Sequence, residues 1–288
     1  MEPSLTPRQQ RIRVGEIELA VRAWPGDGRP WLLVHGLASN ARTWDGVARR
    51  LHQAGHAVMA VDQRGHGLSD KPENGYGFDE VTADLRNLIE ALGWRRPLIA
   101  GQSWGGNVVL DFAARYPHLA GGLVMVDGGF IELSAAPDAS WEKVATDLKP
   151  PTLTGQQRGE IASRIAAYHP DWDAEMVEMT LANFETLPDG TVRPWLSLER
   201  HMAILRAIWD QKPSDIYPRV QTPALIAAAD PKQHEANPRK RDEVARAEQG
   251  LARVAVRWFE DTAHDIHVEK PHDLADWMLA ALAEGFFD

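Results

Sequence analysis

The chain has 288 residues, a formal net charge of −10 and no cysteine. The acidic balance argues against binding to nucleic-acid phosphates, and the lack of cysteine excludes disulfides, thiolate nucleophiles and cysteine-bound metals. The N-terminus lacks the apolar segment of a secretory signal and no run reaches the roughly 18 apolar residues of a membrane span, so we expect a cytoplasmic protein that binds no membrane.

The first 130 residues alternate predicted strands with predicted helices. Residues 12–14 and 17–24 flank a Gly-Glu turn and predict a hairpin. Short apolar runs predict buried strands, and segments with helical spacing lie between them: strands at 31–34, 57–61, 97–100 and 123–126, and helices at 44–53, 79–92 and 105–116. Such alternation indicates βαβ units and a parallel sheet.

A block from 132 to 214 interrupts this alternation with helical patterns alone, at 141–148, 156–168, 172–186 and 196–209. The alternation then resumes with strands at 224–228 and 254–259 and helices at 240–249 and 271–283. We therefore predict an α/β core made of residues 1–131 and 215–288, with a helical domain at 132–214 inserted into it.

The strongest chemical signal is Gly101-Gln-Ser-Trp-Gly105, which follows a predicted strand and opens a predicted helix. This G-x-S-x-G pattern is typical of a sharp strand-to-helix turn that exposes a serine hydroxyl, and the tightness of the turn leaves room only for glycine on either side. The sequence therefore predicts Ser103 as a nucleophile at a helix N-terminus.

A second motif, His35-Gly36-Leu37, directly follows the strand at 31–34. Serine acyl transfer needs backbone N–H groups aimed at the developing oxyanion. We expect these donors to be Trp104, after the nucleophile, and Leu37 in the earlier loop. His35 precedes the serine, and we interpret it as a structural residue that holds this loop.

The candidate general base is His264, which follows the last predicted strand and precedes the last helix. A loop there can bring an imidazole to the serine at the carboxyl edge of a parallel sheet. His267 is the alternative base. A histidine pair at this spacing without further ligands is poor evidence for a metal site, and no nucleotide or flavin motif is present, so we predict neither metal nor cofactor.

These segments, together with Asp62-Gln-Arg-Gly-His-Gly-Leu-Ser-Asp-Lys-Pro72, resemble the α/β-hydrolase fold superfamily in its cap-bearing branch. The resemblance implies a mostly parallel eight-stranded sheet flanked by helices, with a helical cap inserted after strand six. It also implies a catalytic triad in the order serine, acid, histidine.

The resemblance allows the triad acid after strand six or after strand seven. Asp127 follows the strand at 123–126, and Asp230 follows the strand at 224–228. The usual strand-seven position lies two residues further on, where this chain has Lys232. We favour Asp127, because it needs no such shift, and keep Asp230 as the alternative.

A serine nucleophile attacks acyl carbon, so we predict hydrolysis of a small carboxylic ester or lactone with an apolar moiety. The alternatives are a carbon–carbon bond hydrolase of the same fold and a non-catalytic binding protein. Large apolar cap residues are candidates for the substrate pocket, although most are expected to form the cap's own core: Trp141, Tyr168, Met176 and Trp209. The basic run at 238–241 is interpreted as a solvated helix start. The sequence indicates no oligomeric state.

Overall fold

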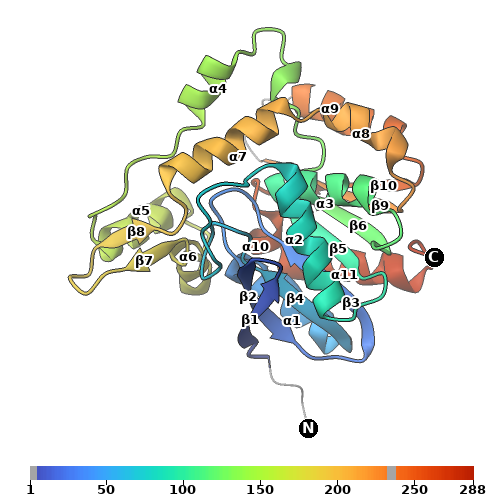
Figure 1. The fold of residues 1–288 in the computed structure, drawn as a ribbon, viewed down its shortest axis with the longest axis horizontal. Helices are drawn as coiled ribbons and strands as arrows, with labels where there is room; N and C mark the ends of the chain where they lie inside the picture. Colours follow the sequence, from blue (N-terminus) through green and yellow to red (C-terminus); the bar gives the residue numbers. More distant parts are fainter. Residues whose placement is uncertain (1–4, 232–237) are drawn as a thin grey trace.

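The computed structural model describes residues 5–231 and 238–288, and its centre is one eight-stranded sheet (Figure 1). The strand order is β1-β2-β4-β3-β5-β6-β9-β10. The strands are β1 Arg8–Val14, β2 Ile17–Trp24, β3 Gly28–Val34, β4 His56–Val61, β5 Leu98–Gln102, β6 Gly122–Val126, β9 Ala224–Asp230 and β10 Val254–Glu260. The hairpin β1–β2 and the pair β2–β4 are antiparallel, whereas all later pairs are parallel. The predicted sheet is confirmed.

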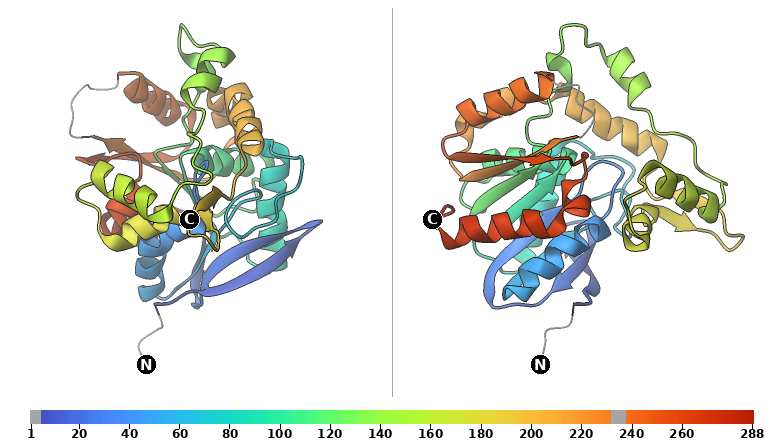
Figure 2. Two further views of the ribbon diagram at one scale, coloured as in Figure 1. Left: turned by 90° about the vertical axis from the view of Figure 1, so that its left-hand side faces the viewer. Right: turned by 180° about the vertical axis from the view of Figure 1, so that it is seen from behind.

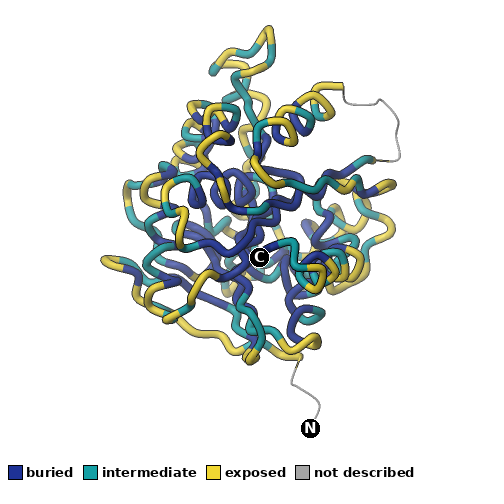
Figure 3. The backbone as a smooth tube through the Cα atoms, turned by 90° about the vertical axis from the view of Figure 1, so that its right-hand side faces the viewer, coloured by how far each residue is buried: buried dark blue, intermediate teal, exposed yellow. Residues whose placement is uncertain are grey.

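The central strands are buried on both faces, as their continuous apolar sequences predict (Figure 3). Successive residues of a strand point to opposite faces, so β3 contributes Leu32 and Val34 to one hydrophobic core and Trp31 and Leu33 to the other. Burial on both faces holds the strand ends rigidly, and the candidate catalytic residues follow these ends.

Helices cover both faces of the sheet (Figure 2). Leu85 of α2 and Phe112 of α3 belong to the core on one face, and Leu51 of α1 and Met278 of α11 to the core on the other. The core helices are α1 Asp45–Gln53, α2 Phe78–Ala91, α3 Trp104–Arg115, α9 Pro238–Gly250, α10 Ile266–Glu269 and α11 Pro271–Ala283. The core therefore has three layers, with the sheet in the middle.

The chain between β6 and β9 forms an insertion beside the sheet, which we call the cap (Figures 1 and 2). Its elements are α4 Trp141–Asp147, α5 Arg158–Tyr168, α6 Ala174–Leu181, β7 Phe184–Thr186, β8 Val192–Pro194, α7 Leu198–Asp210 and α8 Pro213–Ile216. The insertion follows strand six of the sheet, as expected. The exact cap boundaries, 132 and 214, stay a prediction.

The expectation that this insertion is wholly helical is wrong. The predicted helix at 172–186 ends at Leu181, and Phe184–Thr186 pairs antiparallel with Val192–Pro194. Strands of three residues are too short to show a period-2 pattern, and their apolar residues also fit a helical spacing. The cap therefore carries a small hairpin, β7–β8, whose Phe184 faces a cavity described below.

Candidate active site

Ser103 lies at the turn between β5 and α3, in the sharp geometry that its motif predicts. Its backbone has φ 54° and ψ −122°, a conformation that L-residues rarely adopt. A Cβ at Gly101 would lie 2.1 Å from the Gly105 carbonyl oxygen, and one at Gly105 would lie 2.5 Å from that of His35. Both glycines are therefore required by close backbone packing, and Ser103 stands before the first turn of α3.

The loop after β3 brings Leu37 beside the serine. A Cβ at Gly36 would lie 3.1 Å from Ser103 Cβ, so the Gly36–Leu37 backbone lies against the nucleophile. Among the described residues, the N–H groups of Leu37 and Trp104 donate no hydrogen bond. Both N–H groups are therefore available to an external acceptor, and both belong to segments next to Ser103, as the predicted oxyanion hole requires.

His35 is buried and its ring holds this loop. Its Nδ1 lies 2.7 Å from the Gly36 carbonyl oxygen, and its Nε2 accepts a hydrogen bond of 3.0 Å from the Gln63 N–H. Burial lowers the pKa of His35 to about 4, so the ring is neutral at physiological pH. These contacts fit the structural role that its position in the sequence suggests.

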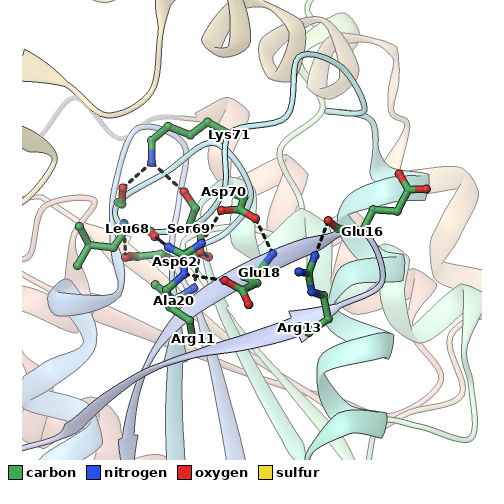
Figure 4. A network of polar contacts seen from close by, with 11 residues as sticks. Arg11, Arg13, Glu16, Glu18, Ala20, Asp62, Leu68, Ser69, Asp70 and Lys71 are labelled. Atoms are coloured by element: carbon green, nitrogen blue, oxygen red, sulfur yellow. Dashed lines mark hydrogen bonds and ion pairs between the residues drawn. The ribbon is translucent and has the colours of Figure 1, made fainter.

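The segment at 62–72 forms hydrogen bonds to the chain after β3, and Figure 4 shows the polar network around its Asp62, Leu68, Ser69, Asp70 and Lys71. Asp62 accepts hydrogen bonds from the N–H groups of Ala41 and Leu68, at 2.7 and 2.9 Å, and so ties its own segment to the chain after Leu37. His66 accepts one of 3.2 Å from the Ala38 N–H. The backbone that presents Leu37 is therefore fixed from two sides.

Asp127 and His264 are in direct contact, although 137 positions separate them in the chain. His264 Nδ1 lies 2.7 Å from Asp127 Oδ2, and Asp127 is 4% exposed. Asp127 Oδ1 also accepts a hydrogen bond of 2.9 Å from the Ala229 N–H. The carboxylate can thus hold the imidazole with Nδ1 protonated and Nε2 free to accept a proton.

The alternative acid, Asp230, is turned to another partner. Its carboxylate forms an ion pair of 3.0 Å with Arg241, and no contact joins it to His264 in the described part of the chain. Lys232, at the other strand-seven position, lies outside the described residues. The geometry therefore favours Asp127 over Asp230.

Gln102 joins the nucleophile turn to the histidine loop. Its Nε2 lies 3.4 Å from the His264 carbonyl oxygen and 3.3 Å from Asp265 Oδ1. Ser103 and His264 themselves form no hydrogen bond here, a common situation in enzymes without bound substrate. Sequence reasoning missed Gln102, because nothing in the motif distinguishes its variable position.

Three charged groups act on His264. Burial lowers the pKa of His264, but the hydrogen bond and charge of Asp127 outweigh it, with a further rise from Asp265 and a small opposite effect of Lys240. The net result is a pKa raised above the usual value of 6.5. For Asp127, burial raises the pKa, but contacts with His264 and Lys240 bring it below its ordinary value. Asp127 is therefore ionised at neutral pH.

The other histidine of this segment, His267, is buried against Trp44, with ring centroids 4.7 Å apart. Burial lowers the pKa of His267 to about 3, and neither ring nitrogen has a hydrogen-bond partner among the described residues. It therefore packs in the core and points no lone pair at Ser103. Within residues 5–231 and 238–288, no cluster of metal-ligating side chains is present.

Two cavities lie between the cap and the core. The larger, of about 520 Å³, we call the cap cavity; its core wall includes Ala38, Ser39 and His66, and its cap wall is mainly apolar. The ring of His66 stacks on that of Trp104, with centroids 5.6 Å apart. The cap cavity therefore adjoins the loop that carries Leu37 and lies next to a residue stacked on the Trp104 ring, whereas Ser103 and His264 are not among the residues that line it. The cap wall is formed by Pro150, Pro151, Thr152, Leu153, Thr154, Asn183, Phe184, Arg193, Pro194, Trp195, Leu196, Ser197, Leu198 and His201.

None of the four cap residues predicted for the pocket lines either cavity. Trp141 packs against Trp209, with ring centroids 6.4 Å apart, so these two stabilise the contact between α4 and α7. Tyr168 is 82% exposed, and Met176 is half-buried on α6. Large apolar side chains selected them, whereas the cavity wall comes from prolines, from the β7–β8 region and from the start of α7.

The part of the chain that the structure describes contains no helix long and apolar enough to cross a membrane. Expectations about partners and oligomeric state are not tested by the single chain.

Comparisons with known proteins agree with this geometry. A model of the alpha/beta hydrolase family matches residues 31–277. The 2-(acetamidomethylene)succinate hydrolase of Mesorhizobium japonicum is 33% identical over 193 residues, which are 65% of this chain and 66% of that protein, just under two thirds of its length.

Two solved structures are similar over nearly their whole length. E-2-(acetamidomethylene)succinate hydrolase gives a TM-score of 0.79 at 23% identity and covers 96% of this chain and 99% of that one. A thioesterase domain from the curacin biosynthetic pathway gives 0.76 at 19% identity, with 95% and 99% covered. Similarity at these identities shows the fold alone. Because the family model spans most of the sequence, the chain belongs to the alpha/beta hydrolase family.

Proposed function

We propose that this protein is a serine hydrolase that cleaves a carboxylic ester or lactone through a triad of Ser103, Asp127 and His264. The observation that carries the proposal is the 2.7 Å contact between His264 and the buried Asp127, at the same sheet edge as the strained Ser103. Backbone strain of this kind persists only where surrounding structure enforces it, and it is concentrated at functional sites.

The chemistry follows from these positions. Ser103 Oγ attacks the acyl carbon while His264 Nε2 takes its proton, and Asp127 stabilises the imidazolium that forms. The N–H groups of Leu37 and Trp104 bind the oxyanion. The imidazolium then protonates the departing alcohol oxygen, and a water molecule activated by the same histidine hydrolyses the acyl-enzyme.

The cap cavity supports a substrate with an apolar moiety. Its volume of about 520 Å³ is in the range of small-molecule sites, and its wall combines Pro, Leu and aromatic side chains with polar ones that include Arg193 and His201. Because it begins at Ala38 and Ser39, next to Leu37, an acyl or alkoxy group that enters it can leave its carbonyl at the oxyanion donors.

The test is a panel of p-nitrophenyl esters of graded acyl length, run beside aliphatic lactones, with Ser103→Ala as the control. We expect turnover of medium-length esters by the unmodified protein, and stoichiometric labelling of Ser103 by a serine-directed phosphonate. Failure of the phosphonate to label Ser103, or equal ester turnover by Ser103→Ala, would contradict the proposal.

A second candidate is hydrolysis of a bond other than an ester, including a carbon–carbon bond. The relative at 33% identity is named for a substrate that is a succinate bearing an acetamidomethylene group, and such a molecule has an amide and two carboxylates but no ester. The same panel should therefore contain 2-(acetamidomethylene)succinate and a vinylogous diketone. A kcat/KM for either that exceeds the best ester by tenfold or more would make this candidate the better one.

A cytoplasmic location and the absence of macromolecular partners remain predictions from the sequence. The third hypothesis, a non-catalytic binding protein, is disfavoured by the complete set of triad residue types, and phosphonate labelling tests it directly.

A further inference from the structure

Lys240 touches the acid of the triad. Its Nζ lies 2.6 Å from Asp127 Oδ1, 2.8 Å from Asp127 Oδ2 and 2.8 Å from the Ala229 carbonyl oxygen. The ammonium side chain is 18% exposed and the carboxylate 4%, so water weakens this ion pair far less than it would on the surface. Lys240 comes from the first turn of α9, on a segment distant in sequence from both Asp127 and His264.

The same carboxylate therefore accepts hydrogen bonds from two side chains, His264 and Lys240. Asp127 Oδ2 accepts from His264 Nδ1 at 2.7 Å and from Lys240 Nζ at 2.8 Å. In a triad without such a lysine, the carboxylate charge is available in full to the imidazolium. Here the Lys240 side chain already contacts the carboxylate, so a part of that charge is offset before His264 takes a proton.

Two consequences follow for the triad. The ammonium fixes the orientation of the carboxylate through both of its oxygens, and the Ala229 N–H and carbonyl groups lock the arrangement on the two sides. It also opposes the protonation of His264, which keeps the imidazole available as a base at lower pH. The other groups that face His264 are Asp127 and Asp265, which favour protonation, and His267, which is neutral because burial lowers its pKa to about 3.

We propose that Lys240 is a positioning residue of the triad, whose ammonium orients the Asp127 carboxylate and extends catalysis to lower pH. The proposal rests on the proposed function, since it assigns a role within the same triad. It changes the interpretation of the basic run at 238–241, because only Lys240 in that run reaches the catalytic carboxylate.

The neighbouring cations provide matched controls. Arg241 pairs with Asp230 at 3.0 Å, and Arg239 pairs with Glu243 at 2.8 Å. Both belong to the same helix start and carry the same charge as Lys240, but neither touches Asp127. Replacement of Arg241 therefore reports the effect of removing one nearby surface charge without breaking the contact with the triad.

The experiment measures kcat/KM for a p-nitrophenyl ester from pH 5 to 9 in Lys240→Met, Lys240→Gln, Lys240→Arg and Arg241→Met. Loss of the ammonium should raise the pKa of the acid limb by about half a unit or more in Lys240→Met and Lys240→Gln. Activity at pH 6, relative to each variant's own plateau, then falls about threefold. Lys240→Arg keeps the positive charge, so its pH profile of kcat/KM should stay close to that of the unmodified protein. Arg241→Met should leave this pH profile unchanged.

A second readout does not depend on turnover. The imidazole of His264 is titrated by NMR in a Ser103→Ala background, with and without Lys240→Gln. The titration midpoint should move upward when the ammonium is absent, whatever the substrate of the enzyme is.

The results separate this proposal from the proposed function. An unmoved acid limb and NMR midpoint in folded Lys240→Gln would overturn the role of Lys240. A uniform loss of activity at all pH values with an unchanged limb would also overturn it, because it would indicate a structural role alone. If Ser103 resists the phosphonate and no ester is hydrolysed, the proposed function fails, while the NMR titration still decides whether Lys240 acts on His264.

Discussion

At the carboxyl edge of the sheet, Ser103 and Asp127 both have left-handed backbones, with φ of 54° and 44°. Each follows a strand that is buried over its whole length. In the cap, by contrast, α7 adds buried residues such as Ile204 and Ile208 to the main core, but the cap's separate hydrophobic cluster is small: Ile161, Val177, Leu181 and Val192. A dense core can maintain strained residues in a single geometry, whereas a thinly packed cap can change its residues at little cost to the fold. We therefore expect the sheet edge to control the chemistry and the cap to control the choice of substrate.

The largest effect should come from Ser103→Ala. Removing the nucleophile is expected to lower kcat by on the order of 10⁶-fold, as in a comparable triad, and to leave the fold intact because the Ser103 side chain does not cap α3. Steady-state kinetics and thermal unfolding measure the two parts. If the purified variant still hydrolyses esters, the expectation that the sheet edge controls the chemistry is contradicted.

The next largest effect concerns the acid. Asp127→Asn should lower kcat by about 10⁴-fold, because an amide at this position favours the wrong tautomer of His264. Asp230→Asn is the matched control, since Asp230 pairs with Arg241 instead, and it should stay within about twofold of the unmodified protein. The reverse ranking of the two variants would show that the acid follows strand seven.

The cap should act on selectivity. Trp195 lines both cavities. Its truncation to Ala should raise KM about tenfold for a long-chain ester, because the apolar contact that the ester loses contributes about 1–3 kcal/mol. Phenyl acetate should be turned over with kcat within about twofold. Trp141→Ala is the control, because Trp141 packs on Trp209 away from the cap cavity. If Trp141→Ala changes the ester selectivity and Trp195→Ala does not, the pocket predicted from the sequence is favoured instead.

The remaining effect is on stability, not on activity, and concerns His267. Its pKa is lowered to about 3 in the folded protein from 6.5, so the unfolded chain binds the extra proton first and stability falls as pH drops below about 6.5. His267→Phe should flatten the fall of the unfolding free energy by roughly 1.4 kcal/mol per pH unit between pH 6 and 4. Urea unfolding at several pH values measures this slope. Unaltered acid sensitivity would show that His267 is not buried as a neutral ring.

Sequence patterns found the elements whose signals are local. The strand–Ser103–helix motif, the histidine-containing loop after β3 and the order of strands and helices are each contained in short segments, and the parallel sheet follows from their alternation. The β7–β8 hairpin was missed because its strands have three residues each. The pocket prediction relied on large apolar side chains, a property that Trp141 shares equally with residues of the cap's own packing.

The amino-acid sequence by itself indicated a candidate nucleophile and a candidate base, because their types and local contexts are constrained by a turn and by a strand end. Only the tertiary structure showed that Asp127, and not Asp230, contacts His264, and that Lys240 contacts Asp127. These contacts join residues that are far apart in the chain: 137 positions separate Asp127 from His264, and 113 separate Asp127 from Lys240. Contacts at such separations are set by the stacking order of the strands and by the packing of α9, which no short segment of the sequence encodes.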